Sequence, residues 1–169
     1  MMKTAKRLLA FALAGVMALA LLTGCSDISA KARQVEENFR SRMKQQGDYQ
    51  KDETLDKKLE AIAQKFQPSW LNNKEGGLTE EARSIIKAEL QDYLVTGSVW
   101  AWVGEVKPGQ SAQAQAESMK RSRGIEYGWY GSYGTPLRAI AFTMTDKKSD
   151  GHRYYLALQT YATINTPQN

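Results

Sequence analysis

The sequence predicts a single α+β domain in which N-terminal helices pack on a small antiparallel sheet that ends in a β-hairpin. Apolar residues recur every three to four positions between residues 28 and 94, as they do on one face of a helix. They alternate at every second position in 99–103 and again in 138–162, which is typical of strands. This order of elements favours helices packed on an antiparallel sheet.

The first 25 residues carry a targeting pattern. Basic residues within 3–7 precede fifteen apolar residues, 8–22, a run shorter than the ~20 residues that span a bilayer. The run ends in Leu22-Thr23-Gly24-Cys25. This ending resembles the lipobox of bacterial lipoproteins, which implies cleavage before Cys25 and a diacylglyceryl group on its sulfur. An ordinary secretory signal and a retained membrane anchor are the alternatives.

The lipobox resemblance divides the chain and predicts its location. Residues 1–24 are the removed signal peptide, 25–30 a short tether, 31–162 the domain and 163–169 a flexible tail. Two or three acyl chains on Cys25 anchor a protein stably, at about 0.8 kcal/mol per buried CH₂. We therefore expect a lipid-anchored protein on the extracytoplasmic face of the cell membrane, with the membrane itself as one partner.

Composition excludes several classes of function. Cys25 is the single cysteine, so the exported domain has no disulfide and no cysteine metal site. The formal net charge of +5 falls to +2 once the three basic residues of the signal peptide are removed. Such a small charge argues against nucleic acid as a partner. We expect no cofactor and no metal, because a zinc centre needs more ligands than the lone His152 supplies.

Three helices are expected in the first half of the domain. An apolar stripe from Ile28 to Met43 predicts a charged helix ending near Gly47, which either packs on the domain or stands as a stalk. Asp52 is an expected N-cap for a helix that Pro68 prevents from continuing. After a loop over 69–77, Thr79 is expected to cap a third helix that runs through Tyr93 and Leu94 and closes at Gly97.

Strands are expected in the second half. Trp100 and Trp102 alternate with smaller apolar residues in 99–103, which places both indoles on one face of a strand, where we expect them in the core. Ser111 is an expected cap for a short helix that runs through Met119 and ends near Gly124. Strands 138–145 and 152–162, joined by the polar loop 146–151, predict a terminal hairpin.

The C-terminal half resembles the CAP (SCP-like) superfamily. Gly104-Glu105-Val106 follows an apolar strand, and the last strand, 154–162, is aromatic-rich with a glutamine before its final Tyr-Ala. The resemblance spans 52–162 and implies a helix–sheet–helix sandwich. Of the acidic and histidine side chains that form the family's metal cavity, only Glu105 has a counterpart, so the resemblance implies a degenerate domain without a metal.

Catalytic candidates are few. Glu105 is the one weak catalytic candidate, and with Glu126 it could form the carboxylate pair of a glycosidase. The alternative is that Glu105 bonds backbone while Glu126 is solvated. His152 follows Asp-Gly at a predicted hairpin tip, where a solvated turn residue is the ordinary interpretation.

Segment 124–136, GIEYGWYGSYGTP, alternates glycines with aromatic residues. Exposed rings stack on sugars, so Tyr127, Trp129, Tyr130 and Tyr133 are the candidate ligand-binding residues; covering the edge of the core is their alternative role. The sequence thus predicts a non-catalytic binding module for envelope material such as peptidoglycan. A hydrolase using Glu105, or an accessory subunit that binds another envelope protein through helix 29–46, are the alternatives.

Overall fold

The computed structural model describes residues 28–72, 77–128 and 134–165. The chain begins with a helix over 28–44, called the N-terminal helix below. The further helices are α2 (Glu53–Lys65), α3 (Glu80–Leu90) and α4 (Ala112–Ser118). The strands are β1 (Leu71–Asn72), β2 (Gly77–Leu78), β3 (Leu94–Glu105), β4 (Lys120–Arg121), β5 (Ile125–Tyr127), β6 (Thr135–Met144) and β7 (Tyr154–Ile164). None of the described helices is both long enough and apolar enough to cross a membrane.

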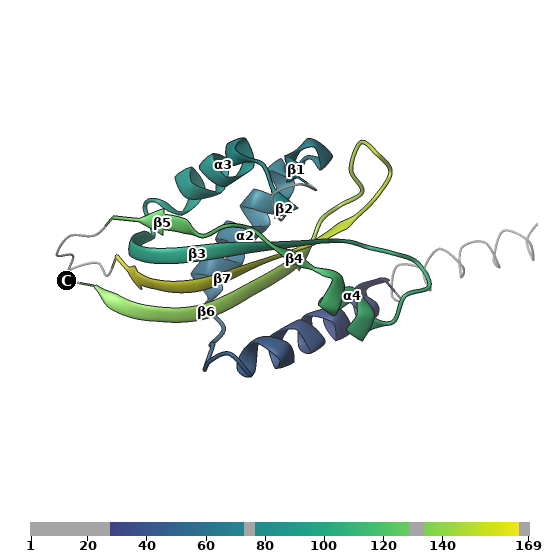
Figure 1. The fold of residues 1–169 in the computed structure, drawn as a ribbon, viewed down its shortest axis with the longest axis horizontal. Helices are drawn as coiled ribbons and strands as arrows, with labels where there is room; N and C mark the ends of the chain where they lie inside the picture. Colours follow the sequence, from purple (N-terminus) through teal and green to yellow (C-terminus); the bar gives the residue numbers. More distant parts are fainter. Residues whose placement is uncertain (1–27, 73–76, 129–133, 166–169) are drawn as a thin grey trace, which may run out of the picture.

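The fold is α+β, as predicted, with helices on both faces of one antiparallel sheet (Figure 1). The strand order is β4-β3-β7-β6, and β5 pairs with β3 on the same side as β4. β1 and β2 form a separate two-stranded sheet. α2 and α3 cover one face of the large sheet, while the N-terminal helix and α4 lie against the other.

The expected helix caps are confirmed. The side chains of Asp52, Thr79 and Ser111 accept hydrogen bonds from the backbone N–H groups three residues later, at 2.7, 3.3 and 3.1 Å. Each bond satisfies one of the N–H groups that the first turn of a helix leaves without a partner. Local sequence alone therefore sets where α2, α3 and α4 begin.

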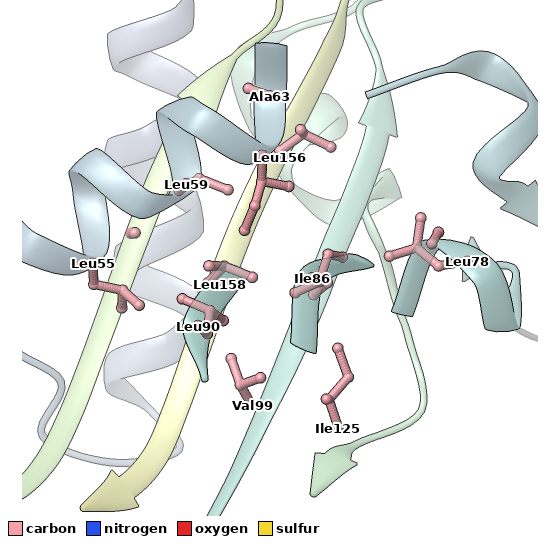
Figure 2. Packing of buried hydrophobic residues seen from close by; sticks show 14 of the residues in the cluster. Leu55, Leu59, Ala63, Leu78, Ile86, Leu90, Val99, Ile125, Leu156 and Leu158 are labelled. Carbon is pink, nitrogen blue, oxygen red and sulfur yellow. The ribbon is translucent and has the colours of Figure 1, made fainter. Parts of the chain in front are cut away.

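The larger core lies between the sheet and the two helices α2 and α3 (Figure 2). Leu55 and Leu59 of α2 meet Leu156 and Leu158 of β7, and Leu90 of α3 completes this layer. All five side chains are at most 3% exposed. Their removal from water is the main favourable contribution to folding on this face.

A smaller core lies under the N-terminal helix, which packs on the sheet rather than standing as a stalk. Val35, Phe39 and Met43 are fully buried. The Phe39 ring meets Trp102 edge-on, with centroids 5.3 Å apart. The expected core position of Trp102 is therefore confirmed, whereas Trp100 is only half-buried.

A buried polar network holds the chain where it leaves the N-terminal helix. The Trp102 indole N–H donates to Gln159 Oε1 (3.1 Å), and Gln159 Nε2 donates to the Tyr49 hydroxyl (2.6 Å). Residue Gln50 then bonds the outer edge of β6 through its backbone, accepting from Ile140 N (3.1 Å). The backbone bonds of Gln50 cover this edge of β6, which would otherwise be free to pair with another strand.

Two predicted boundaries in the first half of the domain were wrong. The third helix ends at Leu90, and Leu94 begins strand β3, because residues from Leu94 onward pair with β7. Tertiary pairing here overrides a local pattern that fits a helix equally well. Part of the predicted loop 69–77 forms a 3₁₀ turn, Pro68–Trp70, followed by β1 and β2.

Three other predicted boundaries also differ. Residues 28–30, expected in the tether, belong to the N-terminal helix. The short fourth helix, expected to end near Gly124, ends at Ser118, and strands β4 and β5 follow it. The tail begins later than expected, because Thr163 and Ile164 pair with β3 and β6 and the Asn165 N–H donates to Tyr93 O.

Gly97, expected as a helix C-cap, instead lies inside β3 with φ of +108°. A Cβ at this position would lie 2.4 Å from the Tyr161 carbonyl oxygen. Gly109 also has a positive φ, +85°, but a Cβ there would meet nothing within 4 Å. Alanine substitutions at these two glycines therefore separate two free-energy costs. Both include the strain of a positive φ, and only the one at Gly97 adds a steric clash.

We predict that Gly97→Ala lowers the free energy of unfolding by about 3 kcal/mol or more, because backbone strain and overpacking add. Gly109→Ala, the matched control, should cost only about 1 kcal/mol. Urea denaturation followed by circular dichroism measures both. Equal losses for the two variants would contradict the close contact between β3 and β7 at Gly97.

Candidate functional site

Within the described residues, one end of the sheet is not covered by a helix. The N-terminal helix has 17 residues and is about 25 Å long, whereas the 12 residues of β3 extend for about 40 Å. The helix covers the end of the sheet that includes Trp102 and Tyr155. At the opposite end, on the left of Figure 1, no described helix lies on that face.

The strand register shows which side chains occupy this uncovered area. Glu126, Ser98, Tyr161 and Arg138 are consecutive cross-strand partners from β5 to β6, so all four point to the same side. Trp100 lies two residues from Ser98 and shares this side. We call the surface formed by Ser98, Trp100, Glu126, Arg138 and Tyr161 the open sheet face.

Tyr161 is the most prominent residue of the open sheet face. It is 55% exposed, whereas the seven residues before it in β7 are all buried. The Arg138 guanidinium lies 4.6 Å from the centre of the Tyr161 ring. At this distance the cation is attracted by the ring, a contact worth about 0.5–1 kcal/mol at an exposed site. The phenol ring and the guanidinium are therefore presented to solvent together.

A second ring–arginine pair lies on the neighbouring strands. The Arg121 guanidinium is 6.0 Å from the Trp100 ring and 5.8 Å from the Trp102 ring. Beside these rings, the Ser98 hydroxyl donates to Glu126 Oε2 (2.5 Å). The open sheet face therefore combines aromatic surface with guanidinium, hydroxyl and carboxylate groups, a composition that suits a ligand with both apolar faces and polar substituents.

The surface is hollowed beside Tyr161. A cavity of about 570 Å³ extends from Tyr161 and Arg138 to Thr163. Asp48 and Gln50, from the segment that follows the N-terminal helix, line its other side. A hollow of this volume falls within the range of small-molecule sites.

The sequence prediction for segment 124–136 is only partly tested. Tyr127 is 5% exposed and packs in the larger core, where burial raises the pKa of its hydroxyl. Its assignment as a ligand-binding ring was therefore wrong, because alternation along β5 turns Tyr127 inward and Glu126 outward. Trp129, Tyr130 and Tyr133 lie outside the described residues, as do Leu22, Thr23, Gly24 and Cys25.

Glu105 lies at the opposite end of the sheet. Its Oε1 is 2.7 Å from Nδ1 of His152, and both side chains are partly exposed. Glu105 also lines a cavity of about 190 Å³ together with Lys107, Lys120 and Tyr154. Nothing in the sequence predicts that Glu105 and His152 lie together. Their contact arises because the end of β3 pairs with the start of β7.

Glu105, at the edge of this second cavity, and His152 beside it form the orienting half of a catalytic constellation. A carboxylate that holds an imidazole is one element of general-base catalysis. Ser118, the hydroxyl residue that lines the cavity, donates to Gln115 O (2.8 Å). Nearby, Asp150 accepts from the Tyr154 hydroxyl, and this bond lowers the pKa of Asp150. In the described part of the chain, no three histidine, cysteine or acidic residues are grouped to hold a metal ion.

Comparison with known proteins found no match, whether the chain was compared with protein-family models, with curated proteins or with solved structures. The function of the site is therefore inferred from the residues that form it.

Sequence reasoning missed Tyr161 as a candidate, although one signal was present. Tyr161 shares a face with Ala157 and Gln159, but lies beyond the reach of a helix as short as 28–44. Comparing the expected lengths of helix and strand would have indicated an uncovered end. Arg138 is adjacent to the aromatic segment in sequence, and the structure places it against Tyr161.

Proposed function

We propose that this protein is a lipid-anchored, extracytoplasmic binding module that holds cell-envelope material, without catalysis, on its open sheet face. The observation that carries the proposal is the exposed Tyr161 ring, which lies against Arg138 beside a 570 Å³ hollow. A hollow lined by an aromatic ring and a few polar groups is the usual composition of a ligand site.

The proposed anchor is consistent with this placement of the binding face. With lipid on Cys25, the N-terminal helix would begin three residues from the membrane attachment point. The open sheet face lies past the other end of that helix, about 25 Å away along its axis (Figure 1). A ligand would therefore be held away from the bilayer, in the space where wall polymers lie.

We predict that Cys25→Ser abolishes lipid attachment, since serine lacks the thiol that carries the diacylglyceryl group. Cells fed a labelled fatty acid should label the wild-type chain and not the variant. The variant should also keep its signal peptide, which mass spectrometry would detect. Equal labelling of the two proteins would contradict the proposed anchor.

The binding function is tested by co-sedimentation of the full-length, detergent-solubilised protein with purified insoluble cell wall. We predict that Tyr161→Ala weakens binding about tenfold because the stacking surface is lost, whereas Tyr161→Phe retains it. Tyr161 is exposed, so Tyr161→Ala should leave the thermal unfolding curve nearly unchanged. Failure of the wild-type protein to sediment, or equal sedimentation of Tyr161→Ala, would contradict the proposal.

The contact between Glu105 and His152 favours a second candidate function, hydrolysis of envelope material. In this hypothesis Glu105, which lines the 190 Å³ cavity, orients His152 as the base that activates a water. We predict that any turnover of wall fragments by the wild-type protein falls at least about a hundredfold in Glu105→Gln. Glu117→Gln, on the exposed side of α4, is the matched control. No turnover by the wild-type protein would contradict this candidate.

The third possibility, an accessory subunit that binds through helix 29–46, is restricted by the fold. Apart from Ile28, the apolar stripe of that helix is buried against the sheet. We do not favour this function, because no other described residue of the helix offers an exposed large apolar side chain to a partner.

A further inference from the structure

The open sheet face presents two aromatic rings close together. Trp100 and Tyr161 lie on adjacent strands, β3 and β7, offset by two residues on the same side. Such diagonal neighbours are about 7–8 Å apart, within reach of one another's side chains. Arg121 lies by the Trp100 ring and Arg138 by the Tyr161 ring, and we call these two ring–arginine pairs the platform.

One charged group of this platform, Arg138, is available to an anionic ligand. Arg121 and Arg138 are exposed here, as are the two acids Asp48 and Glu126. Glu126 already accepts the hydrogen bond from Ser98. Among the ion pairs of the described residues, none involves Arg138, whose guanidinium lies against the Tyr161 ring and lines the hollow together with Asp48.

Because the available cation is an arginine, a carboxylate is the anion that fits it best. A guanidinium presents its N–H groups as a planar fork that matches the two oxygens of a carboxylate. Arg138 is held over Tyr161, so a carboxylate bound to it would lie beside a group stacked on that ring. The ligand is therefore expected to carry an apolar ring face and a carboxylate a few ångströms apart.

We infer that the open sheet face recognises the acidic sugar–peptide unit of the cell wall, with a sugar ring against Tyr161 and a carboxylate on Arg138. This inference rests on the proposed binding function and specifies its ligand class. Neutral glycans, peptides without sugar and acidic polysaccharides of other origin are the competing ligands.

The test is calorimetric titration of the full-length protein with four small ligands. These are a disaccharide–tetrapeptide wall fragment, the neutral N-acetylglucosamine disaccharide, the tetrapeptide alone and a uronic acid disaccharide. We expect the wall fragment to bind at least tenfold more tightly than any of the other three. Arg138→Gln should remove this advantage, so that the wall fragment binds no more tightly than the neutral disaccharide.

Two further variants serve as controls for Arg138→Gln. Arg33→Gln removes an exposed arginine from the N-terminal helix, at the other end of the molecule, and should have no effect. Arg138→Lys keeps the charge but removes the planar fork, and should recover only part of the affinity.

The outcomes separate the inference from the proposed function. Equal binding of the neutral and acidic ligands, or an equal loss for both in Arg138→Gln, would overturn the inference and leave the binding function standing. A preference for the uronic acid or for the free peptide would likewise overturn it. If no ligand binds and the protein does not sediment with cell wall, the proposed function itself fails.

Discussion

Burial of strand β7 on both faces is the constraint on which the rest of this fold depends. All seven residues from Tyr154 to Thr160 are buried, and eleven register pairs join β7 to β3. A strand in this position cannot have one polar side facing water, so each face of the sheet needs its own layer of helices. The helix–sheet–helix order follows from that requirement.

The two helix layers differ in what they cover. α2 and α3 together contact β3, β6 and β7 on one face, where the larger core lies. On the other face, the N-terminal helix and the short α4 cover only part of the sheet. The uncovered end is where Tyr161 is exposed, and the chemistry of the open sheet face is therefore a consequence of helix length.

Gln159, at the boundary between the covered and the uncovered part of the sheet, has a structural role. Gln159 is buried and bonds both Trp102 and Tyr49, so it satisfies its amide where the N-terminal helix ends. A buried amide without partners would be costly. The next residue on the same side of β7 is Tyr161, so the boundary between core and surface falls between these two residues of one strand.

The sequence by itself determined the elements whose signals are local: the caps at Asp52, Thr79 and Ser111, the apolar stripe of helix 28–44 and the alternation of the last hairpin. It also determined the α+β class, because helical and strand periodicities occupy separate parts of the chain. It did not determine where α3 ends, because the Leu90–Leu94 pattern fits a helix as well as a turn and strand until β7 pairs with it.

Only the tertiary structure decided the candidate site. Tyr127 and Tyr161 belong to similar aromatic segments, yet one is buried and the other exposed. The contact of Glu105 with His152 joins residues 47 positions apart in sequence and exists only through the pairing of β3 with β7. Side-chain exposure depends on which neighbouring element covers a given position. A single sequence does not give the distance in space between the two.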